Sequence, residues 1–470
     1  MNEVLLALVL VFYLSLLILY YRSSTPRKLL GTGNLWAITK DHASFLSYRQ
    51  REKCWPELKQ CEALIKELPT LRKRGQEYRD RCDVLCVDLS SRLAELSDEH
   101  AESLAEHVML VFSFLSYAYL RSSEPELRVL PASLAKPWKT ASRFLGRPMS
   151  LDYVATVLAN CHAGEASDSE SVQVYATFTG SPDERHFYAL HARIERAAEP
   201  ALRAMVRILD KSSYGASALA DAMEQIAGAV RTAAQLLPHM KDGCDPTFFY
   251  SELRGLLAGF ESPITLRGVA GTTSVIMHGA SGAQSALLPC VDAFLGIGHH
   301  GQHELPEYAL DRVEHMPVSH RAFLRQLRRS APASREAIKA LVANDSTSSP
   351  NTSDLLARRS LCLDALAAFR QAHLALVKSF IIRPAAKNPA DPLCPSPTST
   401  VTNMVVLPAE EVSSSFLTAP IIPVPVSLTN DDTMLEDVLK ASITEKSLRG
   451  TGGSALACFL RGRLEDTRNA

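Results

Sequence analysis

The sequence lacks an excess of charge of either sign. Its 470 residues hold 50 lysines and arginines against 51 aspartates and glutamates, a formal net charge of −1. Because a strong basic field draws proteins to phosphate backbones, this balance speaks against a nucleic-acid-binding protein. Hydrophobic residues make up 46% and charged residues 21%, as in average globular proteins, which excludes a mostly disordered chain, a collagen-like fibre and a polytopic membrane protein.

Cysteine is also scarce. Ten cysteines in 470 residues are too few for a disulfide scaffold, and their scatter fits free thiols in a reducing compartment. Cys82 and Cys86 lie one helical turn apart, but no second ligand pair follows at zinc-site spacing, which favours buried thiols. Another group in a polar loop either holds a metal or forms a solvated turn. Its members are His299, His300, His303 and Glu304.

Several catalytic signatures are missing. The segment GTGGS (450–454) lacks the Lys-Ser/Thr pair of a P-loop and opens no βαβ unit, and GASGAQS (279–285) has no strand context either. The sequence has no G-x-S-x-G elbow of the kind that carries a hydrolase nucleophile. It also has no C-x-x-C-H, so any haem would be held non-covalently.

One long apolar run stands at the N-terminus. Residues 4–21 contain no charge, and as a helix they would reach roughly 27 Å, enough to cross a thin bilayer core. A cleaved signal peptide is the alternative, but the run is long for one and no small-x-small site closes it. Basic residues follow at 22, 27 and 28, which by the positive-inside rule places the bulk of the chain in the cytosol. We therefore expect residues 1–24 to be a single-pass membrane anchor.

Beyond this run, apolar residues recur at helical spacings of three and four. Residues 55–96 mix leucine and isoleucine with charged residues, and residues 107–120 read as a buried helix. ERHFYALHARIERAAEPALRAMVRIL begins a second unit near Pro182 and reads as one helix. Strand signals are weak throughout, so the predicted fold class is all-α. A Pro- and Ser-rich stretch at 386–448 is expected to be a flexible insertion.

One histidine interrupts an apolar helical stripe. In FRQAHLALVKSF, His373 falls at steps of three and four from Phe369, Val377 and Phe380. A buried partner could satisfy it as an ordinary core histidine. Alternatively, it is an axial ligand, because a single neutral imidazole on an apolar helix suits a flat macrocycle that needs one donor. Spacing alone leaves both interpretations open.

Several stretches resemble the indoleamine 2,3-dioxygenase family, whose members are all-α haem enzymes that oxidise tryptophan. The matching stretches occur in the family's order. They are RVLPASLAKPW (128–138), LDYVATVLANC (151–161), FYSELRGLLAGF (249–260), GASGAQSALLPCVDAFLGI (279–297), MPVSHRAFL (316–324), FRQAHLALVKSFIIRPA (369–385) and GTGGS (450–454).

The resemblance implies a small helical domain (30–179) packed on a larger helical domain (180–470), with haem b between them. His373 resembles the proximal ligand of the haem iron. Arg370 and Asp292 would form a polar pair on the proximal side, which makes sense for a buried guanidinium and carboxylate.

The resemblance also implies a substrate site on the opposite, distal side. Arg254 would bind the carboxylate of the amino acid, and Phe249 and Tyr250 would flank the indole. The remaining positions match, in order, the family's pocket tyrosine, two residues of the loop over the distal haem face, a mobile-loop residue, and a residue that shares a helix face with His191. They are Tyr153, Ser281, Gly282, Thr451 and Phe187.

Two features depart from the family's pattern. His191 stands where the family usually has a small hydroxyl residue. It could bind substrate, as a histidine does beside the indole N–H in the related tryptophan 2,3-dioxygenases, reach the iron, or turn aside to bond a backbone carbonyl. The 386–448 insertion is also long for the family and lies just before the GTGGS loop.

The function implied is a membrane-anchored haem dioxygenase. It would cleave the pyrrole ring of L-tryptophan with O2 to give N-formylkynurenine, drawing on a cellular reductant, with no protein residue assigned as an acid or base. The first alternative is a non-catalytic haem protein that binds oxygen with the same fold. The second is a haem-free, membrane-tethered helical scaffold.

Overall fold

The computed structural model describes residues 38, 44–46, 55–163, 172–210, 214–271, 273–298, 312–344, 350–387 and 463–468. Four predictions fall wholly or almost wholly outside these ranges. They concern the anchor at 1–24, the histidine-rich group at 299–304, Thr451 with the GTGGS loop, and the 386–448 insertion.

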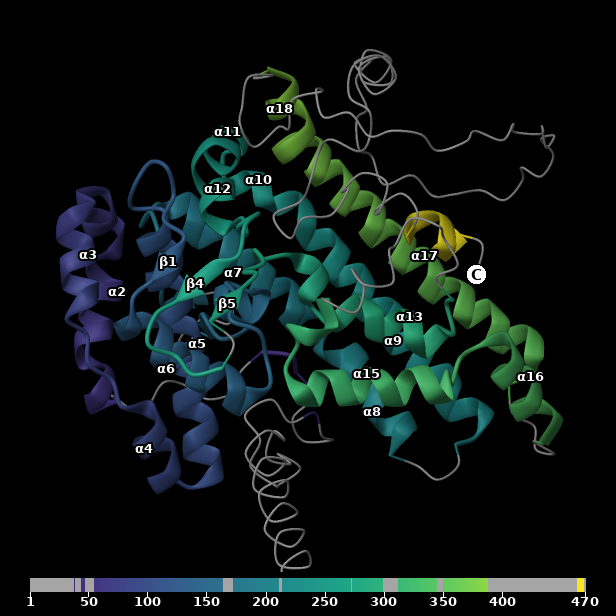
Figure 1. The fold of residues 1–470 in the computed structure, drawn as a ribbon. Coiled ribbons are helices and arrows are strands. Elements are labelled where there is room, and N and C mark those ends of the chain that lie inside the picture. The colour runs from purple at the N-terminus through teal and green to yellow at the C-terminus, as the bar shows by residue number, and fades with distance from the viewer. Residues whose placement is uncertain are drawn as a thin grey trace, which may run out of the picture.

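Helices make up most of the regular structure (Figure 1), which confirms the predicted helical fold class. Short 3-10 and π turns carry the label η. The helical elements in chain order are η1 Pro56–Leu58, α2 Lys59–Leu71, η2 Arg72–Arg74, α3 Gln76–Asp83, α4 Leu89–Glu95, α5 Asp98–Leu120, α6 Ala132–Leu145, η3 Val154–Leu158, α7 Pro182–Ala197, α8 Glu199–Leu209, α9 Ala216–Leu236, η4 Leu237–His239, α10 Met240–Gly243, α11 Pro246–Phe248, η5 Phe249–Leu253, α12 Arg254–Leu257, η6 Gly282–Gln284, α13 Leu287–Leu295, α15 Val318–Ser330, α16 Arg335–Asn344, α17 Thr352–Val377, η7 Lys378–Ile382 and α18 Arg383–Lys387.

Two small sheets accompany the helices in the described ranges. In one, β4 (Ile264–Leu266) pairs in parallel with β1 (Val129–Leu130) and antiparallel with β5 (Ser274–Val275). In the other, β2 (Cys161–Ala163) pairs antiparallel with β3 (Val172–Val174). Strands of two or three residues are too short to show an alternating pattern, which is why the sequence did not reveal them.

Helix α5 is the central helix of the N-terminal half. Within it, residues 104–120 are all buried, as the sequence predicted for 107–120. The helix begins earlier than predicted, at Asp98, where Asp98 and Glu99 place negative charge at the positive end of the helix dipole. The burial of α5 makes it the core around which α2, α3, α4 and α6 pack.

Two stretches of the described chain could cross a membrane by length and composition alone. One is Asp98–Leu120, whose most apolar window is 94% buried inside the protein, and the other is Thr352–Lys387, whose window is 44% buried. Because core helices pass the same test, α5 is explained by its packing. The second stretch begins with α17, which packs along α9 (Figure 1).

The predicted helix over ERHFYALHARIERAAEPALRAMVRIL is two helices. Helix α7 ends at Ala197 and α8 begins at Glu199, with Pro200 in its first turn. Proline has no backbone N–H to donate and suits a first turn, where that N–H would have no helical partner. The prediction of one continuous helix was therefore wrong at this point.

The paired cysteines behave differently from each other. Cys82 is buried in α3, and burial raises the pKa of its thiol to about 12, as expected for an inert core thiol. Cys86 is exposed, because α3 ends at Asp83 and Cys86 lies beyond it. The prediction of a buried thiol was right for Cys82 and wrong for Cys86. Within the described residues, no group of three or more metal-ligating side chains is present.

Candidate functional site

Three aromatic side chains from distant segments meet in one cluster. The ring centroids of Phe187 (α7) and Phe249 (η5) are 5.1 Å apart, and those of Phe249 and Phe380 (η7) are 5.7 Å apart. His191 follows Phe187 by one helical turn and lies 4.5 Å from it, centroid to centroid. His373 precedes Phe380 by about two turns on the same helix. We call these five residues the aromatic site.

His373 behaves as a neutral imidazole. It is half-buried, and burial lowers its pKa to about 4, with a smaller contribution from the nearby His191. No hydrogen bond joins its ring to any of the described residues, so these residues do not support the interpretation as a satisfied core histidine. A neutral imidazole presents a lone pair, which is the form that binds a metal.

His191 has a defined orientation. Its Nδ1 lies 2.8 Å from the backbone carbonyl of Phe187, and burial lowers the pKa of the imidazole. In the neutral ring Nδ1–H therefore donates to this carbonyl, which leaves the lone pair on Nε2. The backbone bond named as one alternative is thus present. It fixes the tautomer that allows Nε2 to accept a hydrogen bond or bind a metal.

Arg254 brings a buried positive charge to the turn that carries Phe249. It is 4% exposed, and its guanidinium carbon lies 5.3 Å from the ring centroid of Tyr250. Phe249 and Tyr250 are buried as well. A planar guanidinium beside aromatic rings suits a ligand with both a carboxylate and an aromatic group.

Three π turns lie in the segments that carry these residues. The N–H of the residue that follows each turn bonds the carbonyl five residues earlier: Ala159 after η3, Arg254 after η5 and Arg383 after η7. Turns of this kind are rare and occur often at functional sites. They follow Tyr153 directly, hold Phe249 and Tyr250, and hold Phe380.

The Gly/Ser loop packs against Tyr153. The backbone N–H groups of Tyr153 and Ser281 both donate to Gln284 Oε1, at 2.9 and 3.1 Å. The Tyr153 ring meets His191 edge to face, with centroids 6.1 Å apart. A side chain at Gly282 would meet no described atom within 4 Å, so the loop has open space beside it. Tyr153 therefore adjoins the His191 side of the aromatic site, and Ser281 and Gly282 lie in the loop that Gln284 joins to it.

The structure brings Arg370 and Asp292 together. Arg370 Nη2 lies 2.8 and 2.7 Å from the two Asp292 oxygens, and both residues are 5% exposed. Arg370 Nη1 also donates to the Arg463 carbonyl at 3.0 Å and to the Thr467 hydroxyl. The pair therefore joins α17, one turn before His373, to α13 and to residues 463–468, the yellow segment in Figure 1.

A surface hollow of about 600 Å³ lies elsewhere. None of the predicted site residues lines it. Its walls come from the N-terminal half and from Arg267, which follows β4 directly. They are Arg79, Asp83, Tyr119, Leu127, Arg128, Val129, Pro131, Ala132, Ser133 and Arg267.

This geometry agrees with a comparison of the whole sequence. The family profile described as Indoleamine 2,3-dioxygenase matches residues 36–470. The chain belongs to the indoleamine 2,3-dioxygenase family. The match spans all five members of the aromatic site, together with Tyr153, Arg254 and the Arg370–Asp292 pair.

Individual members of the indoleamine 2,3-dioxygenase family resemble the chain over most of its length. Indoleamine 2,3-dioxygenase 1 of Mus musculus is 29% identical over 70% of the chain and 79% of the relative. Indoleamine 2,3-dioxygenase of Saccharomyces cerevisiae is 28% identical over 69% and 74%. The 6-hydroxytryptophan 2,3-dioxygenase fscD of Fusarium equiseti is 28% identical over 66% and 80%.

One residue that the sequence analysis missed joins this family's site. Glu195 is buried on α7 and accepts hydrogen bonds from the hydroxyls of Tyr153 and Ser285, at 3.0 and 2.7 Å. The signal was its spacing, because Glu195 follows His191 by four residues and shares its helix face.

Proposed function

We propose that the chain is a haem-dependent dioxygenase that cleaves the indole pyrrole ring of L-tryptophan with O2 to give N-formylkynurenine. The observation that carries the proposal is the neutral imidazole of His373 in one aromatic site with Phe249, whose turn is followed directly by the buried Arg254. Membership in a dioxygenase family supports the reaction type.

The donor set fits haem b. His373 offers one uncharged nitrogen, half-buried and without a hydrogen bond to the described residues. It precedes Phe380 by about two turns, and the packed rings of Phe380 and Phe249 suit a flat, apolar macrocycle. When bound, haem supplies the binding and activation of O2, with electrons from a cellular reductant. Arg370 and Asp292 would hold the His373 helix in place through their buried ion pair.

The other residues orient the substrate. Arg254 would bind the amino-acid carboxylate, and Phe249 and Tyr250 would hold the indole, which fixes the position of its C2–C3 bond. His191 Nε2 would accept a hydrogen bond from the indole N–H. A buried guanidinium beside the Tyr250 ring, in the segment that also carries Phe249, favours this enzyme over a non-catalytic oxygen-binding protein, which needs no group to bind a carboxylate.

The deciding experiment measures product from the reduced, haem-loaded protein. Formation of N-formylkynurenine from L-tryptophan is expected. Because one relative is named for 6-hydroxytryptophan, that substrate is measured in parallel, and the ratio of the two kcat/KM values assigns the preferred indole. Reversible O2 binding without product from either indole would contradict the proposal and favour the oxygen-binding alternative.

Replacing His191 by serine should lower kcat/KM for L-tryptophan by up to roughly tenfold. The variant loses a neutral hydrogen bond to the indole N–H, of about 0.5–1.5 kcal/mol, but no group that takes part in the chemistry. The loss should be smaller for 1-methyltryptophan, which has no N–H to donate. An equal loss for both substrates would show that His191 does not contact the indole N–H.

We also propose that residues 1–24 anchor the protein to a membrane and leave the enzyme in the cytosol. The uncharged run at 4–21 and the basic residues at 22, 27 and 28 support this. Deleting residues 1–24 should release an active enzyme into the soluble fraction, measured by fractionation and kynurenine formation. The full-length protein, washed with alkaline carbonate, is the control. Asn344 and Asn351 lie in N-x-Ser/Thr sequons, which are glycosylated only outside the cytosol, so glycans on either residue would contradict this topology.

A further inference from the structure

Glu195 is a buried acid with no cationic partner among the described residues. It is 2% exposed, and the two hydrogen bonds to its Oε1 come from neutral hydroxyl groups. Its other oxygen, Oε2, is buried and has no hydrogen-bond partner among the described residues. A buried carboxylate normally needs a positive partner, since burial of a bare charge is far costlier than burial of a neutral acid.

In the part of the chain that the structure describes, the groups that face Glu195 do not supply that charge. Tyr153 approaches from the start of η3, Cys290 from α13 and Ser285 from the end of the Gly/Ser loop. On α7 itself, His191 is held neutral by burial. Burial raises the pKa of Glu195 to about 7, because the two hydroxyl groups offset only part of the desolvation. Below that pH the carboxyl group is neutral.

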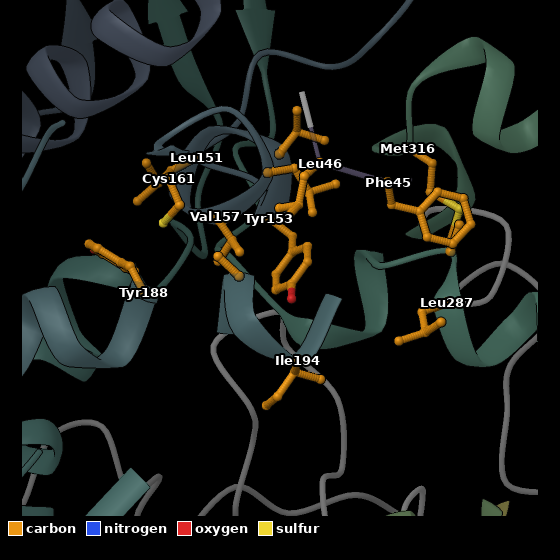
Figure 2. Close-up of a cluster of buried hydrophobic side chains, with 14 of the residues drawn as sticks. Phe45, Leu46, Leu151, Tyr153, Val157, Cys161, Tyr188, Ile194, Leu287 and Met316 are labelled. Carbon is orange, nitrogen blue, oxygen red and sulfur yellow. The ribbon is translucent and has the colours of Figure 1, made fainter. Parts of the chain in front are cut away.

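Glu195 connects α7 to Tyr153 and to the Gly/Ser loop. Through the Tyr153 hydroxyl it holds the ring that contacts His191, and through Ser285 it holds the end of the loop that contains Ser281. Figure 2 shows the Tyr153 hydroxyl directed toward the segment of α7 that carries Ile194, the neighbour of Glu195. Gln284 also joins Tyr153 to this loop, because its Oε1 accepts hydrogen bonds from the backbone N–H groups of Tyr153 and Ser281.

We propose that Glu195 is a positioning residue, which as a neutral acid holds Tyr153 and the 281–285 loop against α7 and so sets the substrate side of the aromatic site. Its effect on catalysis rests on the proposed function. Ionisation strengthens the two hydroxyl hydrogen bonds to Oε1 but leaves a buried charge with no described partner at Oε2, and hydration of this charge loosens the packing around the site as the pH rises. The charge state of Glu195 thereby makes substrate affinity depend on pH.

The test compares the wild type with Glu195→Gln and Glu195→Ala. Glutamine keeps an oxygen that can accept the hydrogen bonds from both hydroxyl groups, and it does not ionise. Alanine removes both hydrogen bonds. Glu195→Ala should raise KM for L-tryptophan about three- to tenfold with a smaller change in kcat. Glu195→Gln should have a KM close to that of the wild type. Between pH 6 and 8.5 the wild-type KM should rise, while that of Glu195→Gln should stay flat. Glu199→Gln, at a partly exposed residue paired with Arg203, is the matched control.

Two readouts do not depend on activity. An infrared C=O band of a buried acid should be present at pH 6, absent in Glu195→Gln, and lost with a midpoint near pH 7. The native pKa of Glu195 exceeds its unfolded value, so its stability contribution is complete below the unfolded pKa and is lost as pH rises through about 7. As the pH rises from the unfolded pKa of glutamate to about 7, the Tm of the wild type should therefore fall more than the Tm of Glu195→Gln.

The outcomes separate the two proposals. Absence of the acid band at pH 6, or a wild-type KM in Glu195→Ala, would overturn the assignment of Glu195. If the wild type forms no product, the proposed function fails, and the infrared band and the Tm comparison still decide whether Glu195 is the neutral anchor.

Discussion

Replacing His373 by alanine should abolish haem binding while the protein keeps its helical circular dichroism. The variant removes the only donor that we assign to the iron, and an apolar site without an axial ligand retains haem weakly. The helical fold should survive because His373 is half-buried and its ring makes no hydrogen bond to the described residues. Haem content and the Soret spectrum of the purified protein measure the effect.

Two controls sharpen this result. Free imidazole can occupy the space left by the side chain, so its addition to the alanine variant with haem should restore the spectrum of a histidine-ligated iron. His100→Ala, at an exposed contact with Ser97 near the start of α5, should change nothing. A His373→Ala protein with full haem and an unchanged spectrum would show that another residue binds the iron.

Replacing Arg254 by alanine should lower kcat/KM for L-tryptophan by tenfold or more, with little change in haem content. A charge-assisted hydrogen bond to a carboxylate contributes about 1.5–3 kcal/mol, and the variant loses it entirely. Steady-state kinetics give the loss, and circular dichroism and Tm show whether the variant remains folded.

The contribution of the planar Arg254 guanidinium can be measured separately from the contribution of its charge. Arg254→Lys keeps the positive charge but lacks the planar fork, so it should recover only part of the activity. Tryptamine has the indole without the carboxylate, and the difference between wild type and Arg254→Ala should largely disappear for this compound. Wild-type kinetics for L-tryptophan in Arg254→Ala would remove the Arg254 contact from the proposal.

Periodicity in the sequence was enough for the long helices and for the position of His373. The burial of α5 follows from its almost wholly apolar residues at 107–120, and the stripe around His373 follows from spacings of three and four. Both signals depend only on neighbouring residues. Phe187 and His191 could be placed on one helix face for the same reason. Periodicity did not show the break between α7 and α8, because the apolar spacing continues through Pro200.

Contacts between distant segments could not be derived from spacing. The approach of Phe187 to Phe249, and of Phe249 to Phe380, depends on how α7, η5 and η7 pack. The pairing of Arg370 with Asp292 was expected only from the family resemblance, since 78 positions separate the two residues. Glu195 was missed because an acid next to arginines in a helix reads as a solvent-facing residue, and its partners Tyr153 and Ser285 become visible only in the folded chain.

The three π turns bear on how this site can evolve. Each holds one residue more than a regular turn would, as expected if a single codon had been inserted into an ordinary α-helix. Removing one residue from η5 would let regular bonding resume, yet it would rotate everything beyond by about 100° around the axis, Arg254 included. A substitution in these segments alters one contact, whereas a one-codon deletion redirects a whole set of side chains. The length of these turns is therefore under a stricter constraint than the identity of most residues in them.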